Sequence, residues 1–157
     1  MERADSVSNA LQFLQTLTEN DPWVLVHDAA RPCIRHSDID EMLQQLGNDP
    51  VGGILGVALT ETVKRVDENN TIQATVDRSG LWRAATPQMF RLNVLSEALS
   101  QSKQASIRIT DEASAMEFMG YNPKMVAGHA DNIKITLPQD LALAALFLQQ
   151  QENGEAP

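Results

Sequence analysis

Two short, unbroken apolar runs, at residues 23–27 and 51–59, constrain the fold of this chain more than any other feature of its sequence. Such runs are typical of strands that are covered on both faces, because a strand with one solvated face alternates apolar and polar side chains. Residues 6–17 instead place apolar side chains at the i, i+3, i+4, i+7 spacing of a helix with one buried face. Strands that alternate with helices predict an α/β domain with a mainly parallel sheet.

The middle of the chain has a different pattern. Residues 62–66 and 71–76 are rich in β-branched side chains and are joined by the polar segment 67–70. This pattern predicts a β-hairpin. Because the hairpin is polar, we expect it to project from the body as an arm over about residues 60–79.

Beyond the arm, the pattern predicts a return to strands and helices. An apolar strand at residues 81–85 is expected to end at residues 86–88 (T-P-Q), and Thr110 is expected to cap a helix. Short strands are predicted at residues 124–126 and 133–136.

The longest apolar run, residues 141–148, is predicted to be a buried helix that ends near residue 150. We therefore expect a single domain over residues 1–150. The polar residues 151–157 are expected to form a disordered tail.

Composition excludes several classes of protein. The chain has 157 residues, with 12 Lys and Arg against 21 Asp and Glu, and a net charge of −9 disfavours nucleic acid as a partner. No apolar run approaches the roughly 20 residues needed to span a bilayer. Met1 is followed at once by two charged residues, so no signal peptide is expected. The single cysteine, Cys33, excludes an internal disulfide and fits a reducing, cytoplasmic location.

Polar residues that directly follow predicted strands are the candidates for a site, because open α/β sheets bind ligands beyond the carboxyl ends of their strands. Asp28 follows the first strand and could contact Mg²⁺, which prefers oxygen ligands. The alternative, which spacing alone favours, is that it accepts backbone hydrogen bonds in a turn and pairs with Arg31. Lys134 could neutralise a phosphate, or it could be a solvated lysine of an edge strand.

Three more residues have both a functional and a structural interpretation. Arg78 ends the predicted arm, where it either pairs with Asp77 or reaches a neighbouring subunit. Thr86 and Thr110 end or begin predicted elements on the same side, where they could donate hydroxyls to a ligand or act as caps.

Other chemistries have weaker support. No G-x-S-x-G elbow accompanies the serines, and the three histidines lack the spacing of metal ligands. The chain begins on a predicted helix and contains neither a G-x-G-x-x-G nor a Walker-type loop. Taken alone, that absence argues weakly against nucleotide chemistry.

Several blocks together resemble the 2-C-methyl-D-erythritol 4-phosphate cytidylyltransferase family. They occur in the family's order over nearly the whole chain, and the H-D-A-A-R-P and D-N-I-K sequences are specific to it. The blocks lie at residues 2–7, 23–32, 62–65, 75–78, 80–82, 86–88, 110–114 and 131–134.

The resemblance implies a Rossmann-like nucleotidyltransferase sheet with flanking helices. It also implies transfer of CMP from CTP to the phosphate of methylerythritol phosphate, with Mg²⁺ and release of diphosphate, in isoprenoid precursor synthesis. By the family's pattern Lys134 orients the acceptor, and Arg78 clamps its phosphate from the arm of the second subunit of a homodimer. Asp28 would lie near the metal and the acceptor. The other implied residues are Ser6 and Ala29 at the nucleotide, and Thr62, Thr86 and Thr110 around the acceptor pocket.

The chain departs from the family at its start. Family members begin with a strand and a glycine-rich loop whose Arg and Lys bind the triphosphate, whereas this sequence starts at the E-R-x-D-S block. We therefore expect an N-terminally truncated part of such an enzyme that is inactive alone. The alternatives are a non-catalytic remnant that dimerises through its arm, and a cytidylyltransferase for another polyol phosphate such as ribitol 5-phosphate.

Overall fold

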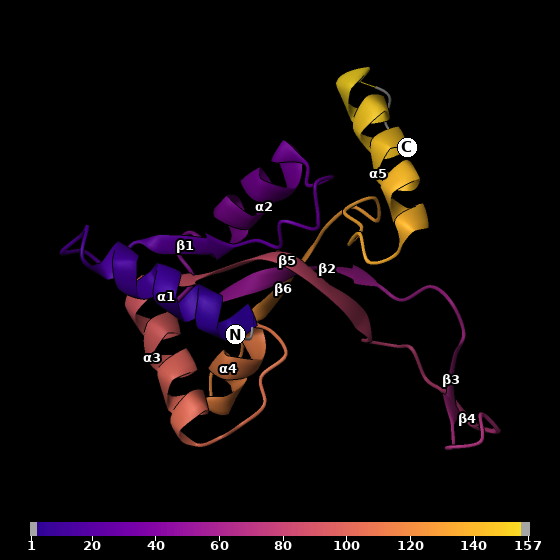
Figure 1. The fold of residues 1–157 in the computed structure, drawn as a ribbon, viewed down its shortest axis with the longest axis horizontal. Coiled ribbons are helices and arrows are strands. Elements are labelled where there is room, and N and C mark those ends of the chain that lie inside the picture. The colour runs from indigo at the N-terminus through magenta and orange to yellow at the C-terminus, as the bar shows by residue number, and fades with distance from the viewer. Residues whose placement is uncertain (1–2, 155–157) are drawn as a thin grey trace.

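The computed structural model describes residues 3–154 and places a four-stranded sheet between two layers of helices (Figure 1). In their order across the sheet, the strands are β1 (Trp23–Val26), β5 (Trp82–Arg91), β2 (Gly52–Ala58) and β6 (Lys124–Ala127). The helices are α1 (Arg3–Gln15), α2 (His36–Leu46), α3 (Leu92–Gln104), α4 (Glu112–Phe118) and α5 (Pro138–Glu152).

The sheet is mixed, so the α/β class is confirmed but the expectation of a mainly parallel sheet is wrong. β5 is antiparallel to both β1 and β2, and β6 is parallel to β2. A continuous apolar run shows that a strand is covered on both faces, and a central antiparallel strand meets that condition as well. The arm reverses the chain between β2 and β5, and this reversal sets the direction of β5.

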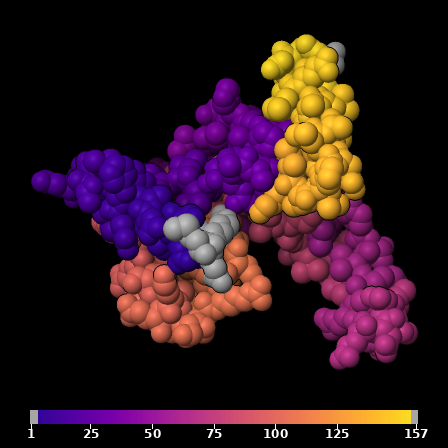
Figure 2. Space-filling view, in the orientation of Figure 1, coloured from indigo at the N-terminus to yellow at the C-terminus, as the bar shows by residue number. Residues whose placement is uncertain are grey.

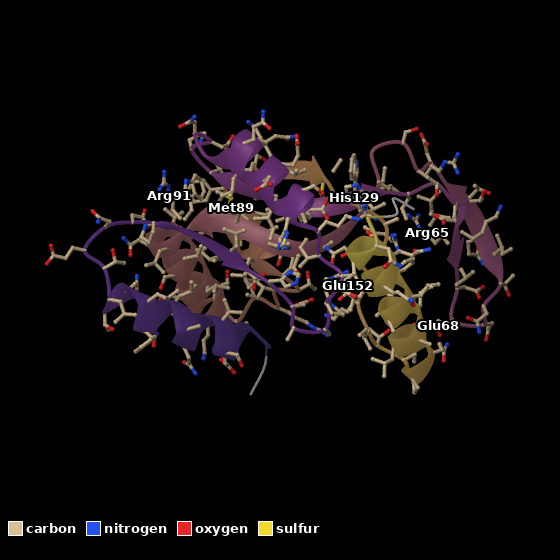
Figure 3. The ribbon with its side chains drawn as sticks, turned by 90° about the horizontal axis from the view of Figure 1, so that it is seen from above. Arg65, Glu68, Met89, Arg91, His129 and Glu152 are labelled. Carbon is tan, nitrogen blue, oxygen red and sulfur yellow. The ribbon has the colours of Figure 1, made fainter. Side chains whose placement is uncertain are left out.

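Each face of the sheet has its own core. Met89 and Phe90 are consecutive residues of β5 and are both fully buried, because successive side chains of a strand point to opposite faces. Met89 packs with Met42 and Leu46 beneath α2, as Figure 3 shows for the labelled Met89. Phe90 packs with residues of α3 and α4, among them Leu95. Each fully buried large apolar side chain contributes about 1.5–3 kcal/mol to folding.

The predicted arm is confirmed as a hairpin. Strands β3 (Val63–Val66) and β4 (Ile72–Val76) pair with each other in a separate two-stranded sheet. The arm projects away from the body, and the labelled Arg65 and Glu68 lie on it (Figures 1 and 3). Its apolar side chains Val66 and Ile72 are exposed.

Strand β5 continues through residues 86–88, which we expected to end a strand. The pairing of β1 with β5 reaches only as far as Gln88, and the register between β2 and β5 shifts between Ile54 and Gly56, opposite this segment. A proline is tolerated at such an irregularity because no regular ladder hydrogen bond is required from it there. The strand therefore carries Thr86 in its interior.

Two expectations for the C-terminal part are wrong. Residues 133–136 form a loop and no strand. The amide of Ile133 donates to the carbonyl of Asp131, that of Ile135 to the carbonyl of Ala30 and that of Thr136 to the carboxylate of Asp140, so none of these amides pairs with a strand. Helix α5 continues to Glu152 and so includes the first two residues of the expected disordered tail. The end of that predicted tail, residues 155–157, lies outside the described residues.

Helix α5 is apolar but mostly uncovered, so the expectation of a buried helix is also wrong. Its one buried residue among those described is Ala144, while Leu141, Leu143 and Leu146 are exposed. The space-filling view shows α5, in yellow, standing beside the body as a column (Figure 2). None of the described helices combines the length and apolarity that crossing a bilayer requires.

Candidate active site

The side chains of Asp28 and Lys134 meet at one edge of the sheet. Asp28 lies in the turn after β1, and Lys134 lies in the loop between β6 and α5. The ammonium Nζ of Lys134 is 3.0 Å from Oδ2 of Asp28, and Nε of Arg31 is 3.7 Å from the same oxygen. The structure therefore brings together the two residues that we expected to share a site.

A cavity of about 260 Å³ opens beside this pair. Its lining includes Asp28, Arg31, Thr86, Gln88, Thr110 and Lys134. Four of the predicted site residues thus surround one space. The functional roles that the resemblance implies for them remain predictions.

Thr86 holds the turn that carries Asp28. Its hydroxyl accepts a hydrogen bond from the backbone amide of Asp28 at 3.0 Å and lies 3.0 Å from Nδ1 of His27. Thr86 is only 4% exposed, because it lies in the interior of β5. Its hydroxyl is therefore engaged mainly in positioning Asp28.

Thr110 does not cap α4, contrary to our expectation. The N-cap is Asp111, whose side chain accepts from the amide of Ser114 at 3.0 Å. The amide group of Gln88 ties this helix start to β5, donating to Oδ2 of Asp111 at 2.9 Å and accepting from the amide of Ala113 at 2.9 Å. A carboxylate accepts a helix amide more strongly than a threonine hydroxyl, and Thr110 is left exposed at the rim of the cavity.

A second cavity of about 380 Å³ lies next to the first and shares Arg31 and Lys134 with it. Arg83 of β5 also lines this cavity, so three cationic side chains contribute to its wall. Burial lowers the pKa of the Arg31 guanidinium from its ordinary value, Asp28 acts against that effect, and Arg83 adds to it. An arginine remains charged at neutral pH even so. One carboxylate, that of Asp140, also lines this cavity, so its wall carries more cationic than anionic side chains and favours anions.

Sequence reasoning missed the contributions of Arg31 and Arg83. Arg31 belongs to the H-D-A-A-R-P block, but it was interpreted as a pairing partner for Asp28. Arg83 directly follows the G-L-W block but belongs to no motif that would have marked it as a site residue. Gln88 was missed as well, because a glutamine in an apolar strand has no chemical pattern that marks it.

The other four predicted residues lie elsewhere. Ser6 is exposed on α1, Ala29 is exposed in the turn after Asp28, and Thr62 is exposed just before β3. Arg78 is exposed after β4, where its guanidinium donates a hydrogen bond to the carbonyl of Thr60 across the base of the arm. Within residues 3–154, none of these four lines either cavity.

Two carboxylates line the smaller cavity, and Asp28 is the candidate ligand for a divalent cation, because both oxygens of Asp111 accept hydrogen bonds from Ser114 and Gln88. Among the described residues no cluster of three potential metal ligands is present, and the carboxylate of Asp28 faces two cationic side chains. Mg²⁺ is often held by one or two carboxylates together with substrate phosphates. Asp28 fits such a shared site, but the described side chains do not form a cage for the ion.

The mixed sheet, the flanking helices, the projecting hairpin and the cavities at the sheet's edge define a class, the Rossmann-like α/β domains, whose ligands generally bind beyond the ends of their strands. The chain belongs to the 2-C-methyl-D-erythritol 4-phosphate cytidylyltransferase family, whose sequence model matches residues 1–150.

Relatives of that name include proteins from Hahella chejuensis, 53% identical over 149 residues, and from Pseudomonas aeruginosa, 54% identical over 142 residues. The alignments cover 95% and 90% of this chain and 62% and 61% of those relatives. This chain thus spans about three fifths of their length.

Solved structures confirm the fold. The crystal structure of the Francisella tularensis 2-C-methyl-D-erythritol 4-phosphate cytidylyltransferase superimposes with a TM-score of 0.83 at 40% identity, covering 92% of this chain and 67% of that one. The Thermus thermophilus enzyme of the same name has a TM-score of 0.81 at 29% identity and covers 94% and 70%.

Proposed function

We propose that this chain carries the acceptor side of a cytidylyl-transfer site that takes CTP and 2-C-methyl-D-erythritol 4-phosphate. The observation that carries the proposal is the convergence of Asp28, Arg31 and Lys134 at one cavity. Membership of the family supports the choice of reaction. The chain as a whole has a net charge of −9 and repels anions, so the cluster of Arg31 and Lys134 is a local exception that could bind one.

The reaction requires mainly positioning and charge neutralisation. An oxygen of the acceptor phosphate is already a nucleophile at neutral pH. It forms a bond to the α-phosphorus of CTP, while the bond from that phosphorus to the bridging oxygen breaks and diphosphate leaves. Arg31 and Lys134 would hold the acceptor phosphate in line, and the carboxylate of Asp28 would accept a hydrogen bond from a hydroxyl of the polyol.

A second copy of the chain completes the proposed site. Arg78 and Thr62 lie at the base of the projecting arm, away from the cavities of their own chain, so they would reach the acceptor pocket of a partner in a homodimer. The exposed Val66 and Ile72 give the arm apolar surface to bury in that dimer. Ser6 and Ala29 would border the nucleotide, and Thr86 and Thr110 the acceptor.

The proposal includes Mg²⁺, an ion that the protein and the substrate would bind jointly. Asp28 would bind it together with phosphate oxygens. When bound, the ion neutralises charge on the phosphates of CTP. Asp28 itself orients the acceptor through its pairs with Arg31 and Lys134.

We also place the protein in the cytoplasm, without nucleic acid or membrane as partners. Cys33, fully buried, is a free thiol, and burial raises its pKa from the ordinary value. An inert reduced thiol fits a reducing compartment.

The test is titration calorimetry of the purified chain with 2-C-methyl-D-erythritol 4-phosphate, and with ribitol 5-phosphate as the competing acceptor. A second arm measures diphosphate release from CTP in the presence of the acceptor and Mg²⁺, beside the Pseudomonas aeruginosa relative. We expect saturable binding of methylerythritol phosphate that is at least tenfold tighter than that of ribitol 5-phosphate. Equal affinities would favour a different polyol phosphate, and no binding of either would leave the dimerising remnant as the better description.

A further inference from the structure

The loop over residues 128–137 carries Lys134 and contains no helix or strand. The Lys134 side chain is 44% exposed, so its own packing does not fix its place. A lysine stem is flexible, and its charge is positioned by the backbone that carries it. Two neighbours in the same loop, Asp131 and Asn132, are buried at 5% and 6% exposure. Buried polar groups in a loop need partners, and these partners determine where Lys134 stands.

Asp131 ties the loop to two helices through a single oxygen. Its Oδ2 accepts from Nε and Nη2 of Arg35, at 2.9 and 2.7 Å, and from Nε2 of Gln151 at 2.9 Å. Arg35 is the residue before α2, and Gln151 lies in the last turn of α5. Burial by itself would raise the pKa of Asp131, but the hydrogen bonds from Arg35 and Gln151 hold it below its ordinary value.

Asn132 ties the same loop to the acceptor cavity. Its carbonyl accepts from Nη1 of Arg31 at 2.8 Å, and its side-chain amide donates to the carbonyl of Thr86 at 2.9 Å. On the other side of Lys134, the amide of Ile135 donates to the carbonyl of Ala30 at 2.8 Å. The backbone is therefore fixed on both sides of the lysine.

A second contact between side chains holds the start of the loop to α2. Nδ1 of His129, which Figure 3 labels, lies 2.7 Å from Oδ1 of Asp38. Asp38 is 2% exposed and lies in the first turn of α2. This contact fixes the loop where it leaves β6, but it is farther along the chain from Lys134 than Asp131 is.

From these contacts we infer that Asp131 is a positioning residue, which, through Arg35 and Gln151, fixes the Lys134 loop so that the lysine reaches Asp28 and the acceptor phosphate. The inference rests on the proposed function for its acceptor, and on the structure alone for the fixing of the loop. It makes α2 and α5 part of the site's support, although neither helix lines the smaller cavity, in which Asp28 and Lys134 meet.

The experiment compares Asp131→Asn with Asp49→Asn as a matched control. Asp49 is also a buried carboxylate, at 6% side-chain exposure, and pairs with Lys124 at 2.6 Å, but it anchors the start of β2 and not the loop. Two measurements are made below the unfolding temperature of every variant: hydrogen exchange at the Ile135 amide, and the Kd for 2-C-methyl-D-erythritol 4-phosphate.

We expect Asp131→Asn to speed exchange at Ile135 about tenfold more than exchange at β2 amides, and to raise the acceptor Kd about tenfold. Asp131→Glu should recover part of both, because it keeps the carboxylate. Asp49→Asn should lower the unfolding temperature. It should leave the exchange rate at Ile135, relative to that of β2 amides, and the acceptor Kd within twofold of their wild-type values. If Asp131→Asn fails to fold, Arg35→Lys replaces it, since lysine keeps the charge but not the two-point contact.

An exchange rate at the Ile135 amide that is unchanged in Asp131→Asn, or in Arg35→Lys where that variant replaces it, would overturn the inference. A change in acceptor Kd that Asp49→Asn matches would also overturn it, because general loss of stability would then explain both. A wild-type chain that binds no acceptor refutes the proposed function instead, and the Ile135 exchange rate still decides whether Asp131 fixes the loop.

Discussion

The ammonium of Lys134 lies 3.0 Å from the carboxylate of Asp28, although the two residues belong to opposite ends of the chain. The pair matters because the negative charge of Asp28 partly compensates the positive charge that Lys134 presents to a ligand. Nε of Arg31 lies 3.7 Å from the same carboxylate oxygen, so one anion is shared between two cations. An incoming phosphate can then be bound by the positive charge that Asp28 leaves uncompensated.

The first prediction concerns Lys134 itself. Lys134→Ala should raise the Kd for methylerythritol phosphate about tenfold, since a hydrogen bond to a charged group contributes about 1.5–3 kcal/mol. Calorimetry measures the effect. Lys103→Ala is the control, because Lys103 pairs with Asp5 on another surface. Equal losses in the two variants would mean that only net charge matters.

The second prediction concerns Gln88, which is 1% exposed and connects β5 to the start of α4. Gln88→Leu should lower the free energy of unfolding by about 2 kcal/mol, because the amide of Ala113 loses its buried partner. Urea denaturation measures this change. Gln73→Leu, on the exposed arm, should change stability by no more than about 0.5 kcal/mol. A similar small change at Gln88 would show that α4 does not depend on this bridge.

The third prediction concerns pH. The Gly52 amide and the Lys124 ammonium lower the pKa of Asp49 from 3.8 to about 2. A lowered pKa in the folded state stabilises the protein above the ordinary value, and this contribution is lost as the pH falls from about 4 to about 2. Asp49→Asn should therefore reduce the free energy of unfolding by about 1 kcal/mol at pH 7 and by almost nothing at pH 2.

Urea denaturation at pH 7, 5 and 2 tests that difference, with Asp40→Asn on the exposed face of α2 as the control. A stability loss from Asp49→Asn that is equal at all three pH values would contradict the expectation, because a neutral role for the side chain would then explain it.

The fourth prediction concerns the arm. If the chain forms the proposed dimer, Ile72→Lys should shift it toward monomer in light scattering, because the exposed Ile72 would lose apolar contact across the proposed interface. Ile107→Lys is the matched control, since Ile107 is 45% exposed against 61% for Ile72 and lies away from the arm. A mass that both variants leave unchanged argues against dimerisation through the arm.

The fifth prediction separates the arm's structural role from its role at the site. Arg78→Ala should weaken acceptor binding about tenfold while leaving the mass of the dimer unchanged. A monomeric Arg78→Ala variant would instead show that Arg78 acts chiefly by bracing the base of its own arm through the carbonyl of Thr60.

Sequence patterns predicted that Asp28 and Lys134 lie together, but not the element that carries Lys134. The two side chains are in contact, although Lys134 lies in a loop after β6 and not in a strand. The predicted strand at residues 133–136 is a loop, since the amide of Ile135 bonds to the turn after β1 and that of Ile133 bonds within its own loop, and neither bonds to a neighbouring strand. Local propensity does not distinguish those two partners.

By itself, the sequence determined the α/β class, the projecting hairpin and the family, because periodicity and contiguous motifs are properties of neighbouring residues. Only the tertiary structure decided that β5 runs antiparallel between β1 and β2, that Arg83 joins Arg31 and Lys134 at one cavity, and that Asp131 ties their loop to α2 and α5. These features depend on contacts between segments far apart in the chain. Such contacts form only when burial of the two cores brings the segments together.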